Sequence, residues 1–78
     1  MEAQQEVVSQ FAICINNTDY PASLELHKLY RVICDRAAFE EGDLRVVDES
    51  GEDYLYPVEY FIPLELPQEV EQILLQAV

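Results

Sequence analysis

The sequence predicts a single, mainly β domain of five mostly antiparallel strands, followed by a short C-terminal α-helix. Two runs of β-prone side chains flank an acidic turn within residues 44–60. Earlier in the chain, residues 11–15 form a short run that is entirely apolar, and residues 28–35 alternate apolar and polar side chains with the period of a strand. After Pro67 the apolar residues recur at helical spacing instead. With 78 residues the chain has room for one domain and no deep pocket. A mixed α+β domain with a four-stranded sheet is the alternative.

The chain divides into three regions of different pattern. Residues 1–7 show no persistent period, and we expect a flexible lead-in there. Residues 8–66 carry the strand patterns, and residues 67–78 carry the helical one. The first strand is apolar on both sides around residues 11–15, which is typical of a strand that is covered on both faces. We therefore expect this strand near the centre of the sheet.

The second strand is expected at residues 28–35, where Cys34 lies on the apolar face. Asp35 then caps a helical turn or wide loop, and Gly42 ends it. Cys14 and Cys34 both lie in apolar runs and have neither the spacing of a redox pair nor that of metal ligands. We expect two buried, reduced thiols.

The segment 44–60 is predicted to be a β-hairpin. Val46 and Val47 supply branched side chains before the turn, and Tyr54 and Tyr56 supply bulky ones after it. Gly51 can adopt the positive φ that a tight turn requires.

The last extended segment lies between Pro57 and Pro63, so it belongs at an edge of the sheet or in a turn. Pro67 then begins the helix, because proline is favoured in a first helical turn. The apolar stripe of this helix consists of Val70, Ile73, Leu74 and Ala77. We expect the stripe to pack on the β-structure rather than to be reserved for a partner, since so short a helix is marginal unless it is docked.

The charge is strongly negative, with 16 acidic residues against four basic ones and a net charge of −12. Such a field repels phosphate backbones and anionic lipid, which argues against direct binding of nucleic acid or membranes. The acidic surface either keeps a small β domain soluble or attracts a basic protein. The chain begins with no recognisable signal peptide, so we expect a cytoplasmic protein. We also expect a monomer with at most weak dimerisation, because each copy repels the next.

No set of residues resembles a catalytic or metal centre. Asp48 and Glu59 stand at the first and twelfth positions of a calcium-loop window, but its sixth position is Asp53 instead of glycine, so a solvated acidic turn is expected. His27 is the one histidine and is expected at the surface. We therefore expect no enzyme activity, no cofactor and no bound metal.

Two short motifs resemble those of SH3 domains. Residues 56–61, Tyr-Pro-Val-Glu-Tyr-Phe, resemble the hydrophobic-Pro-x-x-Tyr-hydrophobic motif that closes the SH3 barrel, and Asp19-Tyr20 resembles the Asp-Tyr near its start. Residues 24–28 fall where SH3 chains carry a Glu-Leu-Ser-Phe-like run. The match spans residues 11–64 and implies an SH3-like small antiparallel barrel, followed here by the C-terminal helix.

The resemblance also implies a ligand surface. In SH3 domains an aromatic groove holds a polyproline II helix, which would place Tyr20, Pro57 and Tyr60 on that groove. The groove also uses a tryptophan, and this chain has none; Asp43 or Leu44 stands nearest to that position. The resemblance therefore supports an SH3-like barrel more strongly than it supports a proline-rich ligand.

Functional expectations depend on the five tyrosines. Tyr30 shares a strand face with Val32 and is expected in the core, whereas functional and structural roles are equally open for Tyr20, Tyr54 and Tyr60. The predicted function is a non-enzymatic protein-interaction module, and its partner-binding residues are Tyr20, Tyr54, Pro57 and Tyr60. The alternative is an acidic regulator or inhibitor that occupies the basic nucleic-acid site of a partner protein, with residues 48–53 mimicking phosphates.

Overall fold

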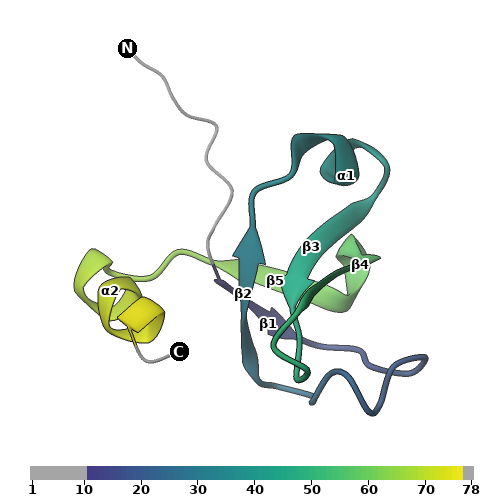
Figure 1. The fold of residues 1–78 in the computed structure, drawn as a ribbon, viewed down its shortest axis with the longest axis horizontal. Coiled ribbons are helices and arrows are strands. Elements are labelled where there is room, and N and C mark those ends of the chain that lie inside the picture. The colour runs from purple at the N-terminus through teal and green to yellow at the C-terminus, as the bar shows by residue number, and fades with distance from the viewer. Residues whose placement is uncertain (1–10, 77–78) are drawn as a thin grey trace.

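The computed structural model describes residues 11–76 as a five-stranded antiparallel sheet with a short C-terminal helix (Figure 1). The strands are β1 (Phe11–Cys14), β2 (Leu29–Ile33), β3 (Asp43–Val47), β4 (Asp53–Pro57) and β5 (Phe61–Leu64). The helices are α1 (Arg36–Glu40), the 3-10 turn η1 (Val58–Tyr60) and α2 (Gln68–Gln76). The lead-in expected at residues 1–7 lies outside the described residues.

The strand order in the sheet is β4-β3-β2-β1-β5, and every neighbouring pair is antiparallel. The mainly β prediction is confirmed, as is the interior position of β1 between β2 and β5. Strands β4 and β5 form the two edges of the sheet, so it is open over the described residues and the predicted closed barrel is not confirmed. Pro63 lies in the edge strand β5, where its missing N–H costs no ladder hydrogen bond.

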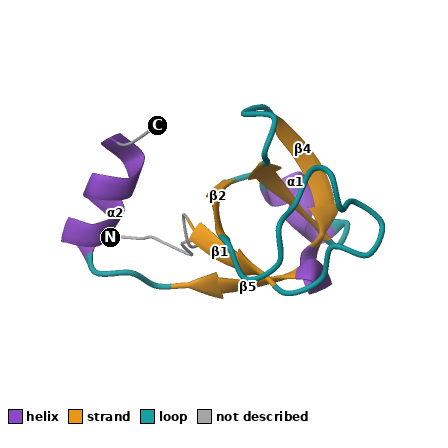
Figure 2. Cartoon of the chain, turned by 90° about the horizontal axis from the view of Figure 1, so that it is seen from below, coloured by secondary structure: helices purple, strands orange, loops and turns teal. Residues whose placement is uncertain are grey.

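The core lies on one face of this twisted sheet, and Figure 2 shows the strands curving around it. In β2 the buried residues Tyr30 and Val32 alternate with the exposed Arg31, as a strand with one covered face requires. The buried cluster consists of Ala12, Cys14, Leu24, Tyr30, Val32, Leu44, Val46, Tyr56, Tyr60 and Phe61.

Loop 15–28, which joins β1 to β2, adds a core residue that the strand patterns do not indicate. Leu24 is only 1% exposed although it lies outside any strand. Its carbonyl accepts a hydrogen bond of 2.9 Å from the Asn17 amide, and its own N–H donates to the Tyr20 carbonyl at 3.0 Å. These bonds satisfy the polar backbone of the loop, so the apolar side chain can enter the core.

Both predicted turns are confirmed. Asp35 caps α1 by accepting a hydrogen bond of 3.1 Å from the Ala38 N–H, and Gly42 follows the helix with φ of 90°. In the β3–β4 hairpin Gly51 has φ of 84°. Arg45 connects these regions, because its guanidinium contacts the carboxylates of Asp35 and Asp53, each at 2.8 Å.

Two expectations about burial are not met. Cys14 is buried, but the prediction that Cys34 is buried is wrong: it is exposed, because β2 already ends at Ile33 and the chain turns there towards α1. Both thiols are free, as expected.

The expected packing of α2 on the sheet is not observed. None of its described residues is buried, Ile73 is 64% exposed, and the helix stands beyond the end of β5 (Figures 1 and 2). Tyr60, Phe61 and the loop residue Leu24 already fill the core.

Each helix among residues 11–76 is too short or too polar to span a lipid bilayer.

Substitution of Leu24 tests the role of loop 15–28. We expect Leu24→Ala to lower the free energy of unfolding by about 2–5 kcal/mol, since it removes buried methyl groups and leaves a cavity. Leu55→Ala, at an exposed position of β4, is the matched control and should lower the free energy of unfolding much less. Chemical denaturation of both variants measures the difference, and equal losses would mean that the loop does not contribute to the core.

Candidate functional site

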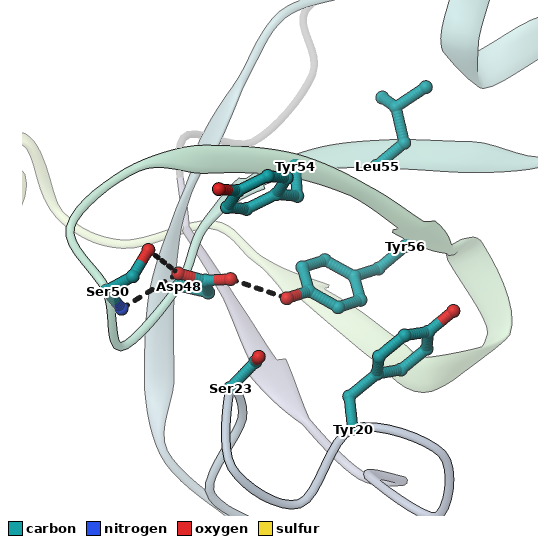
Figure 3. A pocket seen from close by; sticks show the side chains of 7 residues that line it. All are labelled: Tyr20, Ser23, Asp48, Ser50, Tyr54, Leu55 and Tyr56. Atoms are coloured by element: carbon teal, nitrogen blue, oxygen red, sulfur yellow. Dashed lines mark hydrogen bonds between the residues drawn. The ribbon is translucent and has the colours of Figure 1, made fainter.

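An open pocket lies between loop 15–28 and the β3–β4 hairpin. Its volume is about 410 Å³, which is within the range of ligand-binding pockets. Figure 3 shows the residues that line it: Tyr20, Ser23, Asp48, Ser50, Tyr54, Leu55 and Tyr56. Along β4, Tyr54 and Tyr56 share one face and Leu55 points to the other, as the period of a strand requires (Figure 3).

Three tyrosines give the pocket its aromatic surface. Tyr56 is buried, and the ring of Tyr20 packs edge-on against it with centroids 4.9 Å apart. Tyr20 is 39% exposed and Tyr54 is 49% exposed, so each offers part of its ring to solvent. The Tyr54 hydroxyl donates to Glu52 at 3.0 Å, which places a carboxylate at the rim. The pocket thus combines a fixed aromatic interior with two accessible rings.

Asp48 is the acidic group of the pocket and is only 6% exposed. Its carboxylate accepts hydrogen bonds from the Ser50 N–H at 2.8 Å, the Ser50 hydroxyl at 2.6 Å and the Tyr56 hydroxyl at 2.5 Å. Burial raises the pKa of the Asp48 carboxyl, but the bonds from Ser50 and Tyr56 outweigh burial and hold the pKa below its ordinary value. The residue is therefore a buried anion, so the expected solvated acidic turn is observed at residues 49–53, which are exposed, but not at Asp48.

The Tyr56 hydroxyl is well suited to donate to the Asp48 carboxylate, because its own pKa is raised. Burial, and then donation to Asp48, raise the pKa of Tyr56 to about 12. The phenol therefore keeps its proton at physiological pH and remains a donor to the carboxylate.

Glu49, the next residue, fixes loop 15–28 to the hairpin turn. Its N–H donates to the Ser23 carbonyl at 3.0 Å, and its carboxylate accepts hydrogen bonds from Tyr30 and Lys28. The bonds from Lys28 and then Tyr30 lower the pKa of Glu49. The Tyr30 hydroxyl in turn accepts from the Glu25 N–H at 2.7 Å. These contacts hold one wall of the pocket against the other.

The structure brings together some of the predicted partner-binding residues. Tyr20 and Tyr60 lie side by side with ring centroids 6.1 Å apart, and Tyr20 and Tyr54 both line the pocket. Tyr60 is buried, and its hydroxyl donates to Asp19 at 2.6 Å, so it supports Tyr20 from within. Donation to Asp19, and then burial, raise the pKa of Tyr60 to about 12. Pro57 is half-buried at the end of β4 and, like Tyr60, is not among the lining residues.

Sequence reasoning missed Ser23, Asp48 and Ser50 as parts of this site. The signal for two of them was present, because an aspartate two residues before a serine in a turn commonly accepts bonds from that residue's backbone. Nothing local indicates Ser23, since its position depends on the contact between loop 15–28 and the hairpin.

No group of three or more metal-binding side chains occurs within residues 11–76. His27 is exposed, as expected. It has a left-handed backbone conformation, with φ of 64°, near the end of loop 15–28 where the chain turns into β2. Comparison with protein-family models, curated proteins and solved structures finds no match to this chain.

The acid sensitivity of folding tests the role of Asp48. Because its folded pKa lies below the ordinary value of 3.8, its contribution to stability is present above that value and is lost as the pH falls through the folded pKa. We expect Asp48→Asn to be less stable at pH 7 and to lose less stability on acidification than the wild type. Urea unfolding across the acidic range measures both effects.

Glu40→Gln is the control for that experiment, because it removes one negative charge at an exposed position of α1. This variant should retain the stability and acid dependence of the wild type. If Asp48→Asn behaved like Glu40→Gln, the anchoring role of Asp48 would be refuted.

Proposed function

We propose that this chain is a small, non-enzymatic protein-interaction domain that binds its partner at the pocket between loop 15–28 and the β3–β4 hairpin. The observation that carries the proposal is the pair of half-exposed rings, Tyr20 and Tyr54, on opposite walls of that pocket. Tyrosine is enriched at interfaces, since it offers a large apolar area with a polar tip and loses little conformational entropy on binding. The net charge of −12 favours a monomer.

We also propose an SH3-like architecture. Its support is that the two motifs that carry the resemblance meet in space: Tyr60 donates to Asp19 and packs near Tyr20, across 41 residues of sequence. The 3-10 turn η1, which lies within the motif at residues 56–61, leads directly into β5. A proline-rich ligand is a weaker form of the proposal, because buried Leu44 and its neighbour Asp43 stand where the aromatic groove would need a tryptophan.

A second candidate function rests on the distribution of charge. After Arg45 the chain contains no basic residue, while acidic side chains continue through the hairpin turn and into α2. Such a surface could occupy the basic nucleic-acid site of a partner protein and inhibit it. In that case charge, rather than the tyrosine rings, supplies the affinity.

Affinity capture with immobilised protein tests the first function. The double variant Tyr20→Ala/Tyr54→Ala should retain partners about tenfold less than the wild type does, because truncation of interface anchors has large effects. Phe39→Ala is the matched control, since Phe39 is an aromatic residue of α1 that is 53% exposed and not among the pocket residues. It should retain the same partners as the wild type.

The salt dependence of the same capture separates the two functions. Binding through the pocket should weaken only moderately between about 50 and 200 mM salt, because few charges take part, whereas binding through charge alone should weaken steeply. If the folded tyrosine double variant retained the same partners as the wild type, the proposed surface would be refuted. Steep salt dependence in that variant would favour the acidic regulator.

A further inference from the structure

Two adjacent carboxylates of the hairpin turn have the same kind of partner. Asp48 accepts a hydrogen bond from the hydroxyl of Tyr56, and Glu49 accepts one from the hydroxyl of Tyr30. Each pair joins a phenol ring to a carboxylate whose pKa lies below its ordinary value. The two pairs differ in what stands beside them.

A lysine contacts the Tyr30–Glu49 pair. The Nζ atom of Lys28 lies 2.6 Å from a carboxylate oxygen of Glu49 and 5.5 Å from the centroid of the Tyr30 ring. The ammonium group is thus in contact with an anion and near the face of an aromatic ring, both of which stabilise a cation. The molecule itself therefore shows which group a tyrosine–carboxylate pair of this kind accommodates.

The Tyr56–Asp48 pair lines the open pocket instead. The residues that line it include no lysine or arginine, and the pocket contains the rings of Tyr20 and Tyr54 in addition to the Tyr56–Asp48 pair (Figure 3). Arg45, also in the hairpin, is held by Asp35 and Asp53. Besides Tyr56, the donors to Asp48 are the N–H and the hydroxyl of Ser50, and among residues 11–76 no lysine or arginine lines the pocket at this pair.

We propose that this pocket receives a lysine or arginine side chain of the partner protein, which takes beside Tyr56 and Asp48 the place that Lys28 takes beside Tyr30 and Glu49. The inference rests on the proposed function and names the group that the binding surface recognises. The aliphatic stem of the incoming side chain lies along the exposed rings, and its charged end approaches Asp48. Glu52, bonded to Tyr54 at the rim, adds to the attraction.

Other occupants fit the same surfaces less well. A phosphate or carboxylate would be repelled by Asp48 and by the net charge of −12. An apolar side chain would pack on the exposed rings of Tyr20 and Tyr54 but would gain nothing from the negative charge of Asp48 and Glu52. A cation with an apolar stem satisfies both the rings and the carboxylate.

Titration of the full chain with three short peptides, followed by NMR, tests this inference. The peptides are acetyl-Gly-Lys-Gly-amide, acetyl-Gly-Arg-Gly-amide and acetyl-Gly-norleucine-Gly-amide, of which the last has an apolar stem without the charge. We expect saturable shifts at Tyr20, Ser50 and Tyr54 with the lysine and arginine peptides, and affinity about fivefold or more weaker for the norleucine peptide. Equal binding of the norleucine peptide would overturn the inference.

Two variants and a small amine complete the test. Tyr54→Leu keeps an apolar side chain but removes the ring, so it should lower the affinity for the lysine peptide severalfold. Phe39→Leu should leave the affinity for the lysine peptide unchanged. Unchanged affinity in folded Tyr54→Leu would contradict the proposal. Methylamine should bind more weakly than the lysine peptide, and equal affinity would indicate a site for free amines instead of a protein side chain.

The result can be separated from that of the proposed function. If capture of partners depends on Tyr20 and Tyr54 but the peptides show no preference for a positive charge, the interaction domain stands and the basic-side-chain inference fails. If the lysine peptide binds but captured partners are indifferent to the tyrosines, the pocket binds cations and the proposed interaction surface fails.

Discussion

The hydrogen bonds of the adjacent carboxylates Asp48 and Glu49 are the constraint on which the rest of the site depends. Asp48 shapes the hairpin turn through Ser50 and holds the Tyr56 hydroxyl, while Glu49 joins the same turn to Tyr30 and to the backbone of loop 15–28. Together these contacts fix the distance between the two walls of the pocket. The edge-on packing of Tyr20 against Tyr56 adds a further contact between the loop and the hairpin.

This arrangement is unusual for so small a core, because it buries the Asp48 carboxylate, whereas an apolar side chain at that position would have no charge to remove from water. An anion removed from water is costly, and one with its hydrogen bonds made is tolerated. The phenol donors suit this purpose, since the raised pKa of Tyr56 keeps it protonated under physiological conditions. A polar network that is fully satisfied also favours one register of loop and hairpin over the alternatives, whereas a partly satisfied one would destabilise the domain.

The sequence predicts the elements whose structure is set by neighbouring residues. The hairpin around Gly51, the alternation in β2, the cap at Asp35 and the start of α2 after Pro67 all follow from local backbone preferences and periodicity.

Features that depend on distant contacts were not predictable in this way. The burial of Leu24 and Asp48 requires loop 15–28 to fold onto the hairpin, and no local pattern encodes that contact. The exposure of α2 is likewise non-local, because its periodicity indicates an apolar stripe but not whether the core has room for it. Among the site residues, Tyr54 could be placed on a face of its strand from the sequence, whereas the role of Tyr60 beneath Tyr20 could not.

The central claim is that Asp48 is a buried anion held by Tyr56 and Ser50, and carboxyl carbon NMR during an acid titration tests it most directly. Our account predicts a pKa for Asp48 below its ordinary value of 3.8, and a higher pKa in Tyr56→Phe, where the phenol donor is lost and the ring remains. A wild-type pKa at or above the ordinary value, unchanged by Tyr56→Phe in a folded protein, would contradict the account.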